Sequence, residues 1–368
     1  MTTVLVTACG CPGGPSLVRG LRGDFRVVGT DLDPAAAGRF HADAFYPTPP
    51  GHDPAFIDTL RDICRREGVD AVLPESSHEV LALARARGHF EDDGVTVLVS
   101  EEAAVRAALD KAETYRLVEG ADVPLPCYHL IKERADGVVA FNDLCNAVYE
   151  LGYPGRPVVL KRPDGKGGRG IWIVQDEVDR ISLDMRRWPN AQRVTLPEVT
   201  QWCAGQMAAG RLLGRWLVME YLEGDESSAD TFDGYGTVLG FTKIRRDCRN
   251  GVHWRHEARY DPDLARWARR VVERLGLEYF VNVQFMAGKL LEVNPRISTM
   301  IYHEGYNLPA LGVKLALGLV TEEETALPDG VRAQYHLDLR SYGGPERGAC
   351  DGCEQGAGCG DGCRFCGG

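Results

Sequence analysis

The sequence lacks long apolar runs and an excess of positive charge. No stretch reaches the roughly 18 consecutive apolar residues that a membrane-spanning helix needs. The formal net charge is −11, which argues against binding nucleic acid through its phosphates. An anionic small molecule can still be bound where Lys and Arg gather locally. The chain enters its first strand without a basic leader, so we expect a cytoplasmic protein with no membrane or nucleic-acid partner.

Nucleophile motifs are also missing, and cysteine is unevenly distributed. No Gly-x-Ser-x-Gly motif occurs, so nothing indicates a serine nucleophile. Of the twelve Cys, five crowd the last 19 residues and seven are scattered. The scattered ones are typical of reduced core residues in a cytoplasmic protein. The 368 residues, 44% of them hydrophobic, are enough for two or three domains.

Strands and helices alternate at the start of the chain. Residues 3–7 form an apolar strand pattern, followed by a Gly-rich turn, a helix and a second strand at 26–30 that ends at Asp31. This is the outline of a dinucleotide site, but the turn lacks the Gly-x-Gly opening. The continuing alternation predicts a doubly wound parallel sheet.

A polar group follows the strand predicted at residues 71–74. Glu75, Ser76, His78 and Glu79 come directly after it, at the strand end where such sheets bind ligands. The same residues could equally be helix caps and surface side chains. Both interpretations stay open.

A Gly-rich loop lies between two strand patterns at residues 157–163 and 171–174. The loop carries Lys166 and Arg169 among its glycines, and Lys161 precedes it. Backbone N–H groups can approach phosphates closely where no Cβ intervenes. An ordinary hairpin loop is the alternative, and the cations favour a phosphate-binding flap.

The stretch from Leu290 to Arg296 predicts a strand whose last residues have side chains suited to binding metal and phosphate. Glu292 and Asn294 are two residues apart, so a strand places them on one face. A neighbouring strand at 280–285 adds Gln284 to that face through a short hairpin turn. These oxygens suit Mg²⁺, and the guanidinium of Arg296 suits phosphate.

These motifs together resemble the ATP-grasp ligases, over roughly residues 1–320. The resemblance is to the branch with the carbamoyl phosphate synthase large-chain domains and the stand-alone carboxylate–amine ligases. Five ordered motifs carry it: Asp110-Lys111, Val159-Leu160-Lys161 with its Gly-rich loop, Met219 to Glu226, Asn282-Val283-Gln284 and Glu292 to Arg296.

The resemblance implies a role for each motif. Lys111 and Lys161 should contact ATP phosphates, under a loop containing Gly165, Lys166, Gly167, Gly168 and Gly170. The backbone of Glu220, Tyr221 and Leu222 should receive the adenine, and Glu226 should hold the ribose. Gln284, Glu292 and Asn294 should ligate two Mg²⁺, and Arg296 should stabilise the transferring phosphoryl group. Catalysis would rest on Arg296, Lys161 and Asn294.

The acceptor side departs from the family pattern. Thr299 stands where that branch has a second Arg, so Lys243, Arg245 or Arg246 would supply the substrate contact, with Glu75 and Arg296 as further candidates. The implied reaction is formation of an acyl phosphate and ADP, then attack by an amine. A kinase-like member that stops at the acyl or carbamoyl phosphate, and an ATP-binding regulator without turnover, remain alternatives. An NAD-dependent oxidoreductase would rest on the first strands alone.

The implied fold class is α/β and α+β, an ATP-grasp fold in several parts. We expect a Rossmann-like domain at 1–105, a linker helix at 106–126, a lid subdomain at 127–220, an antiparallel catalytic subdomain at 221–340 and a tail at 341–368. In the tail, Cys350, Cys353, Cys359, Cys363 and Cys366 have spacings typical of Zn²⁺ sites. A redox-labile tail without metal is the alternative. Small-molecule carboxylates and amines are the implied partners, and a homodimer is common among relatives.

Overall fold

The structure is a computed structural model, and it describes part of the chain. The described residues are 1–165, 170–178, 191–234, 237–249, 252–297, 302–303, 306–320 and 332–334. The backbone contacts divide the chain into two units, residues 1–335 and 336–368. The second unit, with the five Cys predicted to bind zinc, lies outside the described residues.

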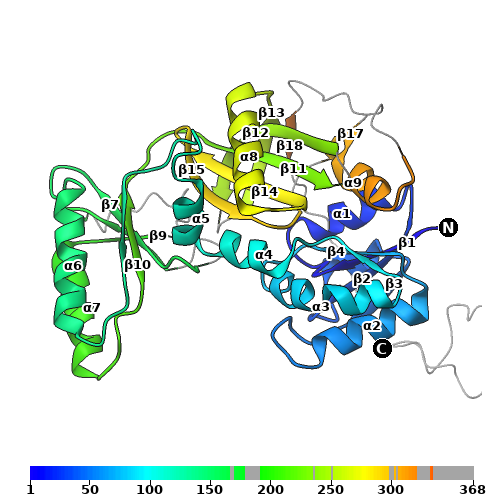
Figure 1. The fold of residues 1–368 in the computed structure, drawn as a ribbon, viewed down its shortest axis with the longest axis horizontal. Helices are drawn as coiled ribbons and strands as arrows, with labels where there is room; N and C mark the ends of the chain where they lie inside the picture. The colour runs from blue at the N-terminus through cyan, green and yellow to red at the C-terminus, as the bar shows by residue number, and fades with distance from the viewer. Residues whose placement is uncertain are drawn as a thin grey trace, which may run out of the picture. The chain divides into compact units, whose positions relative to one another are not determined.

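The first sheet is parallel, and helices cover both of its faces. Its order is β3-β2-β1-β4-β5, with β1 at Thr3–Thr7, β2 at Arg26–Asp31, β3 at Ala44–Pro47, β4 at Ala71–Pro74 and β5 at Thr96–Val97. The helices are α1 at Gly14–Leu21, α2 at Phe56–Glu67, α3 at Val80–Asp92 and the 3₁₀ turn η1 at Ala37–Phe40. Val4 and Val6 pack with α1, whereas Leu5 packs with α2 and α3, so β1 is buried on both sides (Figure 1).

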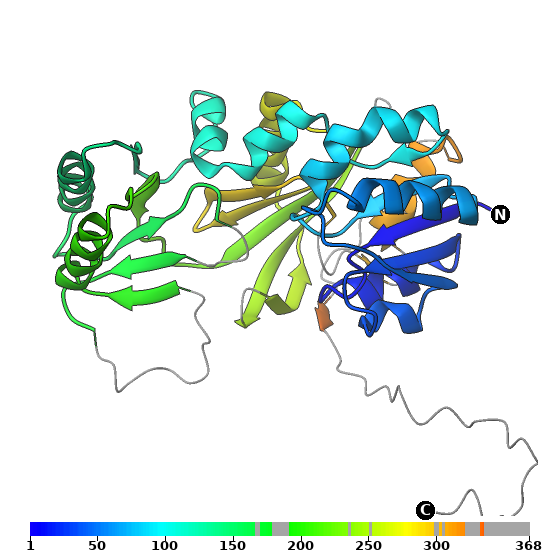
Figure 2. The same cartoon turned by 90° about the horizontal axis from the view of Figure 1, so that it is seen from below.

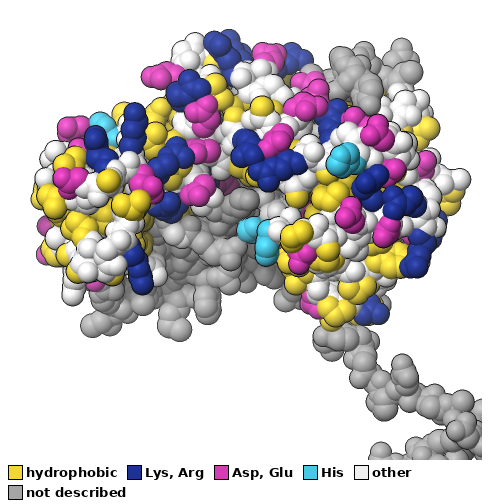
Figure 3. All heavy atoms as spheres, turned by 60° about the horizontal axis from the view of Figure 1, so that its bottom comes forward, with side chains coloured by type: hydrophobic (Ala, Val, Ile, Leu, Met, Phe, Trp, Pro, Cys, Tyr) yellow, Lys and Arg dark blue, Asp and Glu magenta, His cyan; other side chains and the backbone are white. Residues whose placement is uncertain are grey.

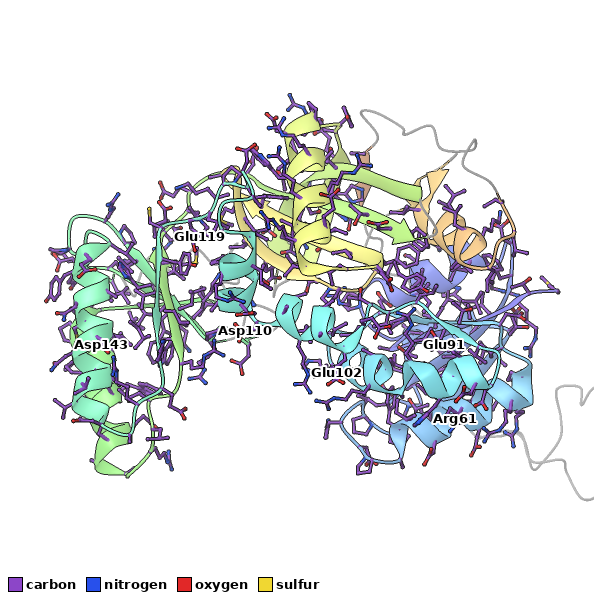
Figure 4. All side chains as sticks on the ribbon, in the orientation of Figure 1. Arg61, Glu91, Glu102, Asp110, Glu119 and Asp143 are labelled. Atoms are coloured by element: carbon purple, nitrogen blue, oxygen red, sulfur yellow. The ribbon has the colours of Figure 1, made fainter. Side chains whose placement is uncertain are left out.

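Two short helices connect the first sheet to the rest of the chain. They are α4 at Glu102–Leu109 and α5 at Lys111–Val118. The single linker helix predicted at 106–126 is therefore wrong in detail. Asp110 between them is extended, with φ −109° and ψ 106°, and its side chain caps α5 by accepting from the backbone N–H groups of Ala112 and Glu113 (Figure 4). An N-cap of this kind starts a new helix where the first one ends.

The second sheet is mixed and carries two helices on one face. Its order is β6-β10-β7-β8-β9, with β6 at Tyr128–Ile131, β7 at Val158–Lys161, β8 at Ile171–Val174, β9 at Ala191–Val194 and β10 at Trp216–Glu220. The helices are α6 at Gly137–Glu150 and α7 at Leu196–Ala208. Buried side chains of both helices share one core with β7, β8 and β10 (Figures 1 and 2).

The third sheet is antiparallel, and it carries the hairpin of the predicted magnesium ligands. Its order is β15-β14-β11-β12-β13-β18, with β11 at Glu226–Gly234, β12 at Thr237–Arg249, β13 at Val252–Ala258, β14 at Tyr279–Met286, β15 at Lys289–Asn294 and β18 at Arg332–Gln334. A small ladder of β16 (Tyr302–His303) and β17 (Tyr306–Asn307) precedes α9 at Leu308–Ala316. Helix α8 at Pro262–Leu275 packs on the face formed by Val281, Val283 and Phe285.

Helix α8 has clear sequence signals at both of its ends. Asp261 accepts from the N–H groups of Asp263 and Leu264 at 3.0 and 3.1 Å, Pro262 is the first helical residue, and Gly276 ends the helix at φ 63°. The mixed α/β and α+β fold class is confirmed. The interpretation of the scattered Cys as core residues is only partly right. Cys9, Cys64 and Cys203 are buried, but Cys127 is exposed, because it lies in the connection before the edge strand β6.

Candidate active site

The hairpin of β14 and β15 brings the predicted magnesium ligands together. Gln284 lies opposite Glu292 and Asn282 opposite Asn294 in the antiparallel register, so the four side chains share one face. The two turn residues, Ala287 and Gly288, have φ values of 50° and 73°. Positive φ at both positions is the type I′ geometry that closes a two-residue hairpin. The predicted shared face is therefore what the structure has.

A β-bulge aims Glu292 at this face. The register shifts between Gln284 and Phe285, so Leu291 is the extra residue on β15. Leu290 and Val293 both belong to the core under α8, a spacing of three that a regular strand cannot place on one side. A bulge next to a site commonly re-aims a side chain in this way.

Asn282 fixes the orientation of the two predicted amide ligands. Its Oδ1 accepts from Gln284 Nε2 at 2.8 Å and from Asn294 Nδ2 at 3.4 Å. Its own Nδ2 donates to Asp230 Oδ1 at 2.8 Å, and Asp230 forms an ion pair with Lys243 at 3.0 Å. Both ligand amides thus turn their nitrogens toward Asn282, and their oxygens face the other way. Oxygen donors from two amides and one carboxylate suit a hard cation such as Mg²⁺.

Two lysines from other elements lie beside Glu292. Lys111, the first residue of α5, has its Nζ 3.3 Å from Glu292 Oε2 and donates to the carbonyl of Gly165 at 2.7 Å. Lys161 ends β7, is 4% exposed, and lies over the Tyr115 ring at 5.8 Å. Burial, and after it the charge of Lys111, lowers the pKa of Lys161 to about 7, while Glu292 opposes the shift. For Glu292, burial raises the pKa, but Lys111 and Lys161 outweigh this and the net shift is downward.

Arg296 lies between this cluster and the first sheet. Its Nε donates to Ser77 Oγ at 2.9 Å and its Nη1 to the carbonyl of Ile297 at 2.7 Å. Burial lowers the pKa of the guanidinium, and the charges of Glu75 and then, more weakly, Cys11 and Glu292 oppose this. The arginine therefore interacts with carboxylates on both sides, one on β15 and one after β4.

The side chains predicted to bind the nucleotide and the substrate form hydrogen bonds and ion pairs within the protein. Glu220 at the end of β10 accepts from the backbone N–H of Cys127 at 2.7 Å and from Lys289 at 2.5 Å, while Tyr221 and Leu222 follow it. Glu226 forms an ion pair with Arg245 at 2.7 Å. Of the Gly-rich loop, Gly165 and Gly170 are described, whereas Lys166, Gly167 and Gly168 lie outside the described residues. Arg246 has a described backbone only, and Thr299 is also outside.

Tyr115 is a site residue that the sequence interpretation missed. It is fully buried, and its hydroxyl donates to the carbonyl of Leu291 at 2.9 Å. Its position four residues after Lys111 on α5 places the two on one helix face. That spacing was the available signal.

The comparisons with known proteins agree with this architecture. Residues 213–338 match the family model described as ATP-grasp in the biosynthetic pathway with Ter operon, and residues 15–98 match that of the PylC-like N-terminal domain. A search of curated proteins found no match.

Solved structures resemble the chain over most of its length. N5-carboxyaminoimidazole synthetase from Staphylococcus aureus, complexed with ADP, has a TM-score of 0.60 at 15% identity, covering 90% of this chain and 80% of that one. Biotin carboxylase from Campylobacter jejuni, in a complex named β-γ-ATP, has a TM-score of 0.62 at 17% identity, covering 88% and 72%. L-amino acid ligase from Bacillus licheniformis has a TM-score of 0.56 at 14% identity, covering 86% and 74%.

The chain has the ATP-grasp fold. The resemblance inferred from its motifs is thereby confirmed. The second sheet with α6 and α7 lies within residues 127–220, for which a lid role stays a prediction, and the third sheet carries the predicted metal ligands.

Surface charge and helix length are the features on which nucleic-acid binding and membrane spanning depend. On the face drawn in Figure 3, Lys and Arg side chains are interspersed with Asp and Glu side chains, without an extended positive area. In the described part of the chain, no helix combines the length and apolar character that crossing a bilayer requires. Nor do the described residues hold a group of three or more His, Cys, Asp and Glu arranged for a metal. The predicted magnesium ligands are a different set of donors, one carboxylate with two amides.

Proposed function

We propose that the protein is an ATP-dependent carboxylate–amine ligase that works through an acyl phosphate and releases ADP and phosphate. One juxtaposition supports this most. The Glu292 carboxylate lies 3.3 Å from Lys111 Nζ and feels the charge of Lys161, on the strand that also carries Asn294. Two cations beside hard oxygen donors are the combination that phosphoryl transfer needs, because it depends on positioning and charge neutralisation.

The similar solved structures support ATP as the nucleotide. The Staphylococcus aureus synthetase is a complex with ADP, and the Campylobacter jejuni carboxylase is a complex named β-γ-ATP. The Bacillus licheniformis protein is named an L-amino acid ligase. Amide formation from a carboxylate and an amine is therefore a reaction that this fold supports, and we propose it for this chain.

Magnesium is the metal that the donors fit. Gln284, Glu292 and Asn294 would hold it, since Asn282 takes both amide nitrogens and leaves the amide oxygens facing away. A bound Mg²⁺ would supply positive charge beside the phosphates of the nucleotide and so lower the cost of bringing them together with an anionic substrate.

The side chains of the protein bind the phosphates and stabilise the charge that develops during the reaction. Lys111 and Lys161 hold the phosphates, and Arg296 balances charge on the phosphoryl group as the substrate carboxylate attacks the γ-phosphorus. The resulting acyl phosphate is attacked by the amine at its acyl carbon, and phosphate leaves. Lys111 donates to the Gly165 carbonyl at 2.7 Å, so phosphate binding at Lys111 is coupled to the start of the Gly-rich loop.

The test is product analysis with a panel of carboxylates and amines. We expect amine-dependent release of ADP and phosphate, lost in Glu292→Gln and retained in Glu133→Gln, whose side chain is exposed. Release of AMP and pyrophosphate would refute the scheme. ADP formation without dependence on an amine would indicate the kinase-like alternative. Nucleotide binding without turnover over the whole panel would indicate a regulator.

Two further proposals concern where the protein acts and what its tail binds. We propose that the enzyme acts in the cytoplasm on small molecules. The tail from 341 to 368 is proposed to bind Zn²⁺ through its Cys pairs, on sequence spacing alone. Metal analysis of the purified protein with and without those residues tests this, and equal zinc content in both would refute it.

A further inference from the structure

Three carboxylates gather at the carboxyl edge of the first sheet. Asp31 ends β2, Glu75 follows β4, and Glu79 precedes α3. Their exposed fractions are 8%, 3% and 8%. Ligands of open parallel sheets bind at this edge. Acidic side chains alone do not make a site, so the hydrogen bonds of each one decide what the group can do.

Two of the three carboxylates have partners within the protein. Asp31 accepts from the backbone N–H groups of Gly10 and Asp33, at 2.8 and 2.9 Å. Glu79 accepts from the hydroxyl of Thr7 at 2.6 Å. Glu75 differs, because its Oε2 is buried and has no hydrogen-bond partner. A buried polar atom without a partner costs free energy that a bound donor would recover.

The charges around Glu75 are unbalanced. Burial raises its pKa well above the ordinary value, Arg296 opposes this, and Glu79 and Asp31 raise it further. Burial likewise raises the pKa of Glu79 to about 7. Glu75 thus has one guanidinium and two further carboxyl groups around it, and an additional cation with N–H donors would balance these charges. A metal ion fits this place poorly, since the described residues hold no metal-binding group of His, Cys, Asp and Glu.

We propose that this cluster binds the amine substrate as its primary ammonium ion, with Glu75 Oε2 accepting one of the N–H bonds. The inference rests on the proposed ligase function and names the site of its second substrate. Arg296 links the two halves of the reaction, because it follows Asn294 at the end of β15 and donates at 2.9 Å to the hydroxyl of Ser77, two residues after Glu75. The amine is thereby held next to the phosphoryl-transfer site and apart from the magnesium ligands.

The experiment uses a minimal ammonium probe, so it needs no knowledge of the natural amine. The melting temperature of the full chain is measured with ADP and Mg²⁺ present, in methylammonium chloride or in tetramethylammonium chloride of the same concentration. Tetramethylammonium has the same charge but no N–H donor. We expect stabilisation by methylammonium only, with at least tenfold weaker binding in Glu75→Gln. Asp92→Asn removes one negative charge from an exposed position on α3 and should bind methylammonium as the wild type does.

Each outcome decides the inference. Equal responses of the wild type to the two cations would refute it, and this comparison needs no variant. A folded Glu75→Gln protein that keeps its methylammonium response would also refute it. The response to ADP and Mg²⁺ alone reports on the proposed ligase separately. If that response were missing while methylammonium still stabilised the protein through Glu75, the nucleotide assignment would fail and the ammonium site would stand.

Discussion

The hydroxyl of Tyr115 donates to the carbonyl of Leu291 at 2.9 Å, and Leu291 is the extra residue of the bulge on β15. An unpaired bulge residue leaves a carbonyl without its ladder partner. Tyr115 supplies that partner from α5, the helix that begins with Lys111. This hydrogen bond therefore connects α5, which carries Lys111, to the β-bulge that orients Glu292.

Replacing Tyr115 by Phe should cost stability and loosen the metal face. Loss of the hydroxyl leaves a buried carbonyl unsatisfied, so we expect the free energy of unfolding in urea to fall by about 1–3 kcal/mol. Mn²⁺ affinity in the presence of ADP should fall severalfold, because the bulge that orients Glu292 is less constrained. Tyr149→Phe is the matched control, since Tyr149 is 54% exposed, and should change stability by less than about 0.5 kcal/mol. Unchanged stability in Tyr115→Phe would contradict this account.

Asn282 should matter for metal binding without being a ligand. Replacing it by Leu removes the acceptor that holds the amide nitrogens of Gln284 and Asn294, so either amide can rotate. We expect Mn²⁺ binding with ADP, followed by electron paramagnetic resonance, to weaken about 10- to 100-fold. Asn142→Leu, on an exposed position of α6, should leave it unchanged.

A double variant that exchanges Asp230 and Asn282 distinguishes the effect of orienting the ligand amides from the effect of side-chain packing at residue 282. The double variant Asp230→Asn with Asn282→Asp reverses the hydrogen bond between the two residues, yet keeps an acceptor at 282 for the ligand amides. Its Mn²⁺ affinity should lie within a few-fold of the wild type. If the double variant bound Mn²⁺ as weakly as Asn282→Leu, the orienting role of Asn282 would be wrong.

Nucleotide binding should depend on pH through Lys161. The pKa of this lysine is lowered to about 7 in the free protein, and bound phosphate favours the charged form and raises it. ADP affinity should therefore be full below pH 7 and fall as pH rises above it, by up to about tenfold per unit. Titration calorimetry from pH 6 to 9 measures this. In Lys161→Arg the guanidinium stays charged, so the decline should disappear, and a decline retained in that variant would point to another group.

Much of the fold followed from local signals in the sequence. Helix α8 has an Asp-Pro start, an apolar stripe and a Gly end, and these features indicate a helix from the sequence alone because each acts within a few residues. The strands β1, β2 and β4 were equally clear, since parallel strands buried on both faces are nearly continuous apolar runs. The hairpin of β14 and β15 followed from its alternating pattern and its Gly-containing turn.

The parts that were missed depend on tertiary neighbours. Strands β6, β9 and β13 are short or polar, and they exist because a neighbouring strand offers a ladder. The bulge at Leu291 was not predicted, because a regular strand pattern has a period of two residues. Its signal in the sequence was the spacing of three between the apolar residues Leu290 and Val293. The sequence indicated Glu75 as a strand-end acid and a candidate substrate contact, but its lack of a hydrogen-bond partner becomes evident only when the groups around it are in place.

The turn after β1 should be intolerant of side chains for reasons of packing. A Cβ on Gly14 would lie 2.1 Å from the Cys9 carbonyl oxygen, and one on Gly38 would lie 2.2 Å from the same atom. Asp31, the acid that ends β2, accepts from Gly10 N at 2.8 Å. The glycines and the acid that resemble a dinucleotide fingerprint thus hold the turn against α1 and η1, which gives a structural reason for their presence.

Gly14→Ala should accordingly destabilise the protein whether or not any nucleotide is bound to the first sheet. The close contact is with backbone, which cannot move aside, so we expect a loss of roughly 1–3 kcal/mol or more in chemical denaturation. Gly23→Ala is the matched control, because a Cβ there meets nothing within 4 Å, and its stability should stay within about 0.5 kcal/mol of the wild type. NAD titrated into the wild type should give no binding heat. Saturable NAD binding that is lost in a stably folded Gly14→Ala protein would instead show that the turn holds a dinucleotide.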